Sequence, residues 1–283
     1  MKTGITGATG QLGRLVVEKL KQRVDNDSLG ALVRSPEKAA DLGIEAKTFD
    51  YTKPQSLVEG LKGIDHLLLI SGNEVGQRKT QHENVIEAAK KANIKWIVYT
   101  SLLHADTSSL SLAKEHAETE ELLKKSGIPY TILRNGWYTE NYTGSVQGSV
   151  QAGAFVGSAG EGKISSAARE DYAEAAAVVL SGEGHVGKVY ELAGDEAYTL
   201  KELAAEVSKQ VGKEIPYNNL PETEYAGVLS SMGVPEGFAQ AIAQWDTGAS
   251  RNDLYNDQKV LSNLIGRPTT PLTAAVKRAL DQK

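Results

Sequence analysis

Near the start of the chain, eight residues read Thr6-Gly7-Ala8-Thr9-Gly10-Gln11-Leu12-Gly13. They stand between a short apolar run and a segment whose apolar residues recur at helical spacing. We expect Gly7 to allow a tight turn, Gly10 to let the backbone approach a pyrophosphate, and Gly13 to let the helix pack close to the sheet. Free N–H groups at the start of the helix would then face the phosphates. The stretch predicts a dinucleotide-binding turn; a tight strand-to-helix turn without a ligand is the alternative.

Apolar runs and helical patterns alternate over the first 135 residues. The expected strands cover residues 2–6, 29–33, 44–49, 64–70, 96–100 and 130–133. The expected helices cover residues 11–23, 36–42, 53–62, 78–92 and 112–126. Several strands are apolar on both faces, as in a parallel sheet that helices cover on each side. This order predicts an α/β fold with a doubly wound parallel sheet, the NAD(P)-binding Rossmann type.

The pattern changes after residue 135, and a smaller, mostly helical C-terminal lobe is expected. Residues 136–162 are rich in glycine and polar residues and predict loops and short strands. A helix at 171–181 with Asp171 as N-cap and a strand at 188–193 follow. Further helices are expected at 199–211 (opened by a capping box from Thr199 to Glu202), twice within 221–246 (with Pro221 and Pro235 in the first turns), and near 257–265 and 271–281. The predicted dinucleotide-binding domain is 1–135 plus about 165–195, and the predicted substrate-binding lobe is about 136–164 and 196–283.

Composition excludes several classes of function. The chain has 283 residues, a formal net charge of −5 and no cysteine, so it has no disulfides and no cysteine-held zinc or iron–sulfur site. The mild acidity argues against a general nucleic-acid binder. No apolar run approaches the ~20 residues that span a bilayer, and no signal-peptide pattern stands at Met1, so we expect a cytoplasmic protein without a membrane partner. The five histidines show no metal-ligand spacing, and no metal is expected.

Arg34 directly follows the second expected strand, where an NAD site would carry an acidic residue for the ribose hydroxyls. An arginine cannot accept a hydrogen bond from a hydroxyl, but it pairs well with a 2′-phosphate. Ser35 and Lys38 are close enough in sequence to assist. This favours NADPH over NADH; a solvated surface arginine is the alternative.

The acid–base pair of short-chain dehydrogenases is absent. In those enzymes a Tyr-x-x-x-Lys pair follows the fifth strand, with a serine upstream. Here Ser101 is present, but Leu110 stands four residues before Lys114, and no tyrosine lies between Tyr99 and Tyr130. Alcohol oxidation and ketone reduction need such a pair. Hydride transfer to a quinone gives a weakly basic hydroquinone anion that water can protonate, so positioning could supply most of the catalysis.

Other candidate site residues follow the expected strands. His116 is the only titratable candidate with an inward orientation, as a proton donor or as a packed histidine with a satisfied ring nitrogen. We expect Trp137 and Tyr138 to form a flat apolar wall for a planar acceptor; packing of the lobe against the sheet is the alternative. The segment 71–74 would let the cofactor ribose approach.

The chain resembles the NmrA-like branch of atypical short-chain dehydrogenases, and within it the NAD(P)H:quinone oxidoreductase type 2 group. The segments that carry this resemblance are 5–13, 67–71, 74–78, 99–107, 133–142, 169–173 and 188–195. It implies cofactor contacts from Gly7, Thr9, Gly10, Gln11, Leu12, Arg34, Ser71, Gly72, Asn73, Glu74, Tyr138, Thr139, Glu140, Asn141 and Arg169. One departure is Gly72-Asn73, where serines are expected.

The resemblance implies an NADPH-dependent reductase that transfers a hydride to quinones. One alternative is an NADP(H)-binding redox sensor that regulates a protein partner without turnover, as related NmrA proteins do. The other is a reductase of triphenylmethane-type dyes.

Overall fold

A computed structural model describes residues 1–281 of the protein. The chain divides into two compact units. Unit 1 comprises Met1–Asp106, Leu112–Asn135 and Arg169–Leu192. Unit 2 comprises Thr107–Ser111, Gly136–Ala168 and the residues from Ala193 on. The chain therefore passes from one unit to the other several times, and each unit is described by itself below.

Unit 1 contains a seven-stranded sheet in which every neighbouring pair is parallel. In spatial order its strands are β3 (Glu45–Thr48), β2 (Leu29–Val33), β1 (Thr3–Thr6), β4 (His66–Leu69), β5 (Trp96–Leu102), β6 (Tyr130–Asn135) and β8 (Val189–Leu192). The doubly wound parallel fold predicted from the sequence is confirmed. The chain leaves β1 towards β2 on one side and returns to β4 on the other, and ligands of such sheets bind at the carboxyl ends of the strands where the order reverses.

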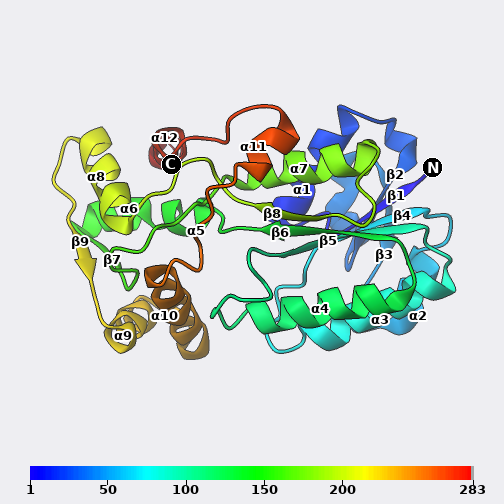
Figure 1. The fold of residues 1–283 in the computed structure, drawn as a ribbon, viewed down its shortest axis with the longest axis horizontal. Coiled ribbons are helices and arrows are strands. Elements are labelled where there is room, and N and C mark those ends of the chain that lie inside the picture. Colours follow the sequence, from blue (N-terminus) through cyan, green and yellow to red (C-terminus); the bar gives the residue numbers. More distant parts are fainter. Residues whose placement is uncertain (282–283) are drawn as a thin grey trace. The chain divides into compact units, whose positions relative to one another are not determined.

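Helices cover both faces of this sheet (Figure 1). One face carries α1 (Gln11–Lys21) and α7 (Arg169–Ser181), and the other carries α2 (Pro54–Gly60), α3 (Arg78–Lys91) and α4 (Ala113–Ser126). The short segments η1 (Asn26–Ser28) and η2 (Pro36–Leu42) are 3-10 helices. The prediction of Asp171 as a helix N-cap is wrong, because α7 begins at Arg169 and Asp171 is buried within its first turn.

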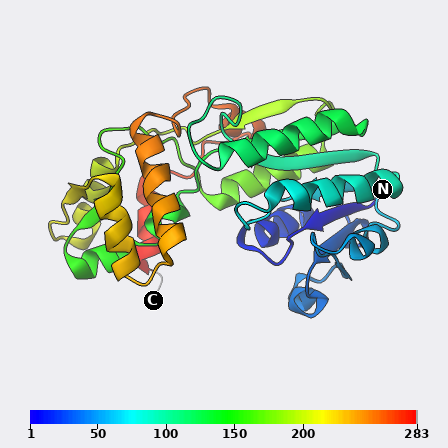
Figure 2. The ribbon, with the colours of Figure 1, turned by 90° about the horizontal axis from the view of Figure 1, so that it is seen from below.

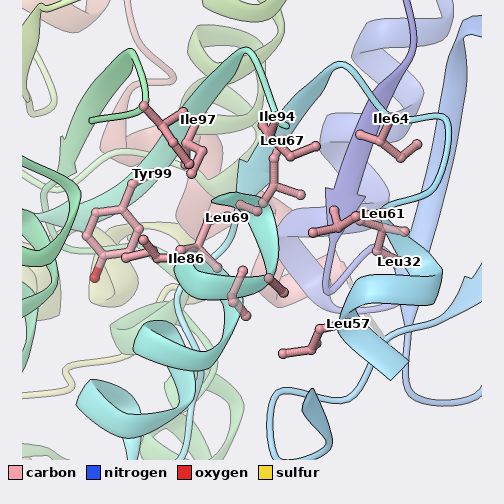
Figure 3. Close-up of a cluster of buried hydrophobic side chains, with 14 of the residues drawn as sticks. Leu32, Leu57, Leu61, Ile64, Leu67, Leu69, Ile86, Ile94, Ile97 and Tyr99 are labelled. Atoms are coloured by element: carbon pink, nitrogen blue, oxygen red, sulfur yellow. The ribbon is translucent and has the colours of Figure 1, made fainter. Parts of the chain in front are cut away.

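The core between the sheet and helices α2 and α3 consists mainly of aliphatic side chains, with the rings of Phe49 and Tyr99 among them (Figure 3). Leu67 and Leu69 of β4 and Leu57 and Leu61 around α2 have no exposed surface. Burying one such side chain contributes about 1.5–3 kcal/mol. This packing holds the carboxyl ends of the central strands in fixed positions, which a site built on them requires.

Unit 2 is mostly helical. Its elements are α5 (Glu140–Thr143), α6 (Val146–Ala152), β7 (Phe155–Gly157), α8 (Leu200–Val211), β9 (Tyr217–Asn219), α9 (Glu222–Ser231), α10 (Glu236–Ser250), α11 (Val260–Ile265) and α12 (Leu272–Asp281). Helices α9 and α10 pack side by side (Figure 2), and the capping box predicted at Thr199 is present. Pro221 and Pro235 are the N-cap residues of these two helices rather than first-turn residues.

The expectation of loops and short strands over residues 136–162 is only partly right. Strand β7 lies there, but two short helices, α5 and α6, precede it. Their glycine, serine and asparagine residues are weak helix formers. Burial of Tyr142 and Val146 anchors the two helices instead, and such tertiary packing is not visible as a periodic pattern in so few residues.

Candidate cofactor site

The turn between β1 and α1 favours glycine at one position and has no room for a side chain at another. Gly7 has a φ of +58°, and its N–H donates to the carbonyl of Leu32 on the neighbouring strand at 3.0 Å. A Cβ atom at Gly13 would lie 2.2 Å from the carbonyl oxygen of Gly7. The first turn of α1 therefore passes closer to the preceding loop than any side chain would permit.

The N-terminus of α1 is available to an anion. Gly10 is its N-cap residue and has no side chain to occupy the N–H groups of the first turn. No acidic residue lies in that turn. Of the predicted contacts, Thr9 is half-buried, Gln11 is exposed and Leu12 is buried. This loop fits the phosphates of a dinucleotide, because its N–H groups and helix dipole attract negative charge.

Arg14 was missed by the sequence reasoning, and it fixes the turn to the segment after β2. Its Nε donates to the carbonyl of Thr9 at 3.3 Å, and its Nη2 donates to the carbonyl of Lys38 at 3.1 Å. Its Nη1 lies 2.6 Å from a carboxylate oxygen of Asp41. The sequence offered no signal for this role, since an arginine in the first turn of a helix usually faces solvent.

Arg34 follows β2 with a side chain that is 71% exposed. Its Nη1 lies 3.6 Å from Oε1 of Glu74, which comes from the segment after β4. Unit 1 thus brings together the glycine turn, Arg34 and the segment 71–74, all predicted as cofactor contacts. They extend from the carboxyl ends of β1, β2 and β4, where the strand order of the sheet reverses.

The segment 71–74 is held by its backbone. The N–H of Ser71 donates to Oγ1 of Thr100 at 2.9 Å, and the N–H of Gly72 donates to Nε2 of His82 at 3.0 Å. Nε of Arg78 donates to the carbonyl of Gly72 at 3.0 Å. A Cβ at Gly72 would come within 3.1 Å of Oε1 of Gln81 on α3. Glycine at this position, where a serine was expected, therefore lets the Gln81 side chain pack closely against the segment.

His82 holds this segment as a neutral ring. It has no exposed surface, and burial together with the charge of Arg78 lowers its pKa to about 3. Nε2 accepts from Gly72, so the proton of the neutral ring is assigned to Nδ1, which donates to Oγ1 of Thr119 at 2.9 Å. Arg78, Gln81 and His82 are buried polar residues at i, i+3 and i+4 of α3. That spacing was the signal by which this supporting row could have been found.

Tyr51 links the carboxyl ends of β1 and β4 through its hydroxyl. Its hydroxyl oxygen lies 2.5 Å from Oγ1 of Thr6 and 2.8 Å from the carbonyl oxygen of Ile70. The N–H of Ile70 in turn donates to Oγ1 of Thr6 at 2.9 Å. Burial raises the pKa of Tyr51, so this hydroxyl stays protonated and joins the two strand ends.

Ser101 is part of a buried ion-pair cluster. Its Oγ donates to Oε1 of Glu120 at 2.6 Å, and Nη2 of Arg134 lies 2.7 Å from Oε2 of the same carboxylate. Nη1 of Arg134 lies 2.7 Å from Glu191 and 3.0 Å from Asp106. The hydrogen bonds to Glu120 raise the pKa of Arg134, and this effect outweighs the lowering by burial. The serine hydroxyl is engaged with a charged partner.

His116 is buried and contacts Tyr99. Its Nδ1 lies 2.7 Å from the tyrosine hydroxyl oxygen. Burial, with smaller contributions from Arg78 and His82, holds the pKa of His116 well below its ordinary value. The ring is therefore neutral at ordinary assay pH, which agrees with a packed histidine better than with a proton donor.

The remaining predicted contacts belong to two places in the chain. Arg169 begins α7 in unit 1, whereas Trp137 and the segment 138–141 lie in unit 2. Trp137 meets Trp245 edge-to-face, with ring centroids 5.7 Å apart. The Thr139 hydroxyl is buried and lies 2.8 Å from that of Ser166. Glu140 and Asn141 form the start of α5.

Within residues 1–281, no three His, Asp or Glu side chains gather closely enough to hold a metal ion. None of the helices described combines the length and the apolar character that crossing a membrane requires.

The comparison with family models matches residues 7–183 to an NAD(P)H-binding family. The chain belongs to this NAD(P)H-binding family. The match begins at the glycine turn and ends just after α7. It therefore includes Gly7 of the glycine turn, Arg34, the segment 71–74 and Arg169.

Similar proteins include Quinone oxidoreductase 2 of Escherichia coli (strain K12), which is 55% identical over 275 residues that make up 96% of each chain. The crystal structure of the NADPH-dependent quinone oxidoreductase QOR2 from Escherichia coli with NADPH has a TM-score of 0.96 at 54% identity, covering 99% of this chain and 100% of that one. The crystal structure of the Citrobacter sp. triphenylmethane reductase with NADP(H) has a TM-score of 0.95 at 38% identity. The match covers 98% of this chain and 100% of that one. The predicted resemblance is confirmed.

Proposed function

We propose that this protein is an NADPH-dependent reductase that transfers a hydride to quinones. The observation that carries the proposal is the grouping, at one end of the sheet, of the glycine turn, Arg34 and the clamped segment 71–74. It is supported by the near full-length similarity to an NADPH-dependent quinone oxidoreductase.

The residues of unit 1 fit the cofactor part by part. The N-terminus of α1 would hold the pyrophosphate, and the Arg34 guanidinium would pair with the 2′-phosphate. The backbone of residues 71–74 would lie along a ribose, because His82 and Arg78 already fix its N–H and carbonyl groups. We also propose the contacts of residues 138–141 and Arg169 with the cofactor.

Bound NADPH supplies a hydride from C4 of its nicotinamide. The quinone takes up this hydride and then one proton, so it becomes a hydroquinone while the cofactor becomes NADP⁺. In unit 1 the Ser101 hydroxyl donates to Glu120, and His116 is a buried ring hydrogen-bonded to Tyr99 with a pKa well below its ordinary value. We therefore assign the proton to water. The protein contributes binding and orientation, which can supply a large share of the rate for two reactants held together.

We propose Trp137 and Tyr138 as the acceptor contacts. Trp137 already packs edge-to-face with Trp245, and such aromatic pairs favour planar ligands. A cytoplasmic location and the absence of a nucleic-acid partner stay predictions from the sequence.

The proposal is tested by adding purified protein to NADPH and a simple benzoquinone and following the loss of absorbance of the reduced cofactor. We expect saturable turnover that depends on both reactants. Tight NADPH binding without turnover of several quinones would contradict the enzyme and favour the sensor alternative. Faster turnover of a triphenylmethane dye than of any quinone would favour the dye reductase, whose Citrobacter counterpart is 38% identical to this chain.

A further inference from the structure

The residue opposite Arg34 is acidic, although it comes from a different strand. Oε1 of Glu74 lies 3.6 Å from Nη1 of Arg34, and both side chains are substantially exposed. In NAD sites the ribose hydroxyls donate to a carboxylate at the end of the second strand. Here the second strand supplies the arginine, and the segment after β4 supplies a carboxylate to the same place. A ribose 2′ substituent that reaches one of these groups is within reach of the other.

Glu74 is held in this position by α3. Its second carboxylate oxygen, Oε2, accepts a hydrogen bond from Nε2 of Gln81 at 2.8 Å. Gln81 is only 6% exposed, and the neighbouring His82 and Arg78 bind the backbone two residues before Glu74. The carboxylate therefore presents Oε1 towards Arg34 from a supported loop, unlike a freely rotating surface glutamate.

We propose that Glu74 is a specificity-determining residue that accepts the ribose hydroxyls of NADH and opposes the 2′-phosphate of NADPH. This inference rests on the proposed function, because it needs the adenosine end of the cofactor to lie beside Arg34. The site can then bind either cofactor: the guanidinium pairs with the 2′-phosphate of NADPH, and the carboxylate accepts a hydrogen bond from the 2′-hydroxyl of NADH. The protein therefore binds both cofactors, and the ratio of its NADPH affinity to its NADH affinity is smaller than it would be with Arg34 and no carboxylate.

The charges give the direction of each effect. A 2′-phosphate must displace Glu74 from Arg34 and then lie close to the displaced carboxylate, and both steps weaken NADPH binding. A 2′-hydroxyl carries no charge and gains an ionised acceptor, so NADH binding is strengthened. Replacing Glu74 with glutamine keeps its shape and the possibility of bonding to Gln81, but it removes the charge that both effects require.

The test uses Glu74→Gln, with Glu59→Gln as the matched control. Glu59 lies on α2 in an exposed ion pair with Lys62, so its substitution makes the same change in net charge away from the site. Binding of NADPH and of NADH to the full chain is titrated without acceptor, by calorimetry at low salt. We expect Glu74→Gln to bind NADH about 3–10-fold more weakly, because an amide oxygen accepts a weaker hydrogen bond than a carboxylate. We expect it to bind NADPH about 2–5-fold more tightly, as for loss of an exposed ion pair.

Arg34→Ala separates this inference from the proposed function. We expect it to bind NADPH about 10–100-fold more weakly while NADH affinity changes little. If Arg34→Ala leaves NADPH affinity unchanged, the phosphate assignment in the proposed function fails. If Arg34→Ala weakens NADPH binding as expected but Glu74→Gln matches Glu59→Gln for both cofactors, only the role of Glu74 is overturned. Wild-type protein without measurable NADH binding at millimolar concentration would also overturn it.

Discussion

The hydroxyl of Ser101 donates a 2.6 Å hydrogen bond to Oε1 of Glu120, and both side chains are buried. The same carboxylate makes two bonds with Arg134, through Nε at 2.9 Å and Nη2 at 2.7 Å. The position that offers a catalytic serine in other short-chain dehydrogenases therefore belongs to a buried ion pair in this protein.

Replacing Ser101 with alanine should reduce stability more than activity. The carboxylate of Glu120 would lose one donor in a buried place, which costs about 1–3 kcal/mol of unfolding free energy. Quinone reduction should keep kcat within about threefold. Denaturant unfolding and steady-state rates measure the two effects. A loss of about 100-fold or more in kcat, typical of an acid–base group, would instead make Ser101 catalytic.

Replacing His116 with glutamine tests the proton-donor hypothesis. Because the ring is buried against Tyr99 and its pKa lies well below the ordinary value, we expect it to stay neutral near neutral pH. We expect the pH profile of kcat to keep its shape in His116→Gln, with a lower unfolding temperature. An inflection that is present in the wild type and lost in the variant would show that His116 titrates during turnover.

Gly13→Ala should damage the fold and cofactor binding together. Its methyl group would lie 2.2 Å from the carbonyl oxygen of Gly7, so α1 or the turn must move. Overpacking against backbone costs roughly 1–3 kcal/mol or more. Gly148→Ala is the control, because a Cβ atom there, in α6, meets no atom within 4 Å; it should stabilise by about 0.5–1 kcal/mol. Equal unfolding curves for the two variants would refute the close approach at Gly13.

Stability should fall as the medium becomes acidic, partly through His82. Its pKa is about 3 in the folded protein against an ordinary value of 6.5, so below pH 6.5 the unfolded chain takes up a proton that the folded chain refuses. The unfolding free energy then decreases by up to about 1.4 kcal/mol per pH unit as pH falls from 6.5 towards 3. His82→Gln should show a shallower decrease, measured by denaturant titration at several pH values. Parallel curves for wild type and variant would contradict this origin.

The centre of the sheet was predictable from the sequence because strands β2, β4 and β5 are largely apolar and buried on both faces. Leu67 to Leu69, for example, are completely buried, and such runs stand out between polar helices. The glycine turn was predictable for a related reason. The positive φ at Gly7 favours glycine, and the close approach at Gly13 leaves no room for a side chain, so the residue types themselves indicate the structure.

The partners of the predicted site residues were not predictable. Nothing in the sequence around Arg34 indicates that it contacts Glu74, which lies 40 residues later and follows a different strand. The contact exists only because the sheet orders its strands as β2-β1-β4. The same holds for Ser101. Its place at a strand end suggested a hydroxyl that could reach a substrate, but that hydroxyl donates to Glu120 of helix α4. Long-range polar contacts depend on the assembled fold, whereas hydrophobic periodicity is local.

The interleaved path of the chain has a consequence for its synthesis. Strand β8 and helix α7, which complete the sheet beside β6 and pack against α1, come from residues 169–192. When residue 135 has just left the ribosome, the nascent sheet still has β6 as an open edge, and an unpaired strand edge invites association with other chains. A gene fragment that stops after β6 should therefore aggregate more readily than one that extends through β8, because it also lacks helix α7 against α1.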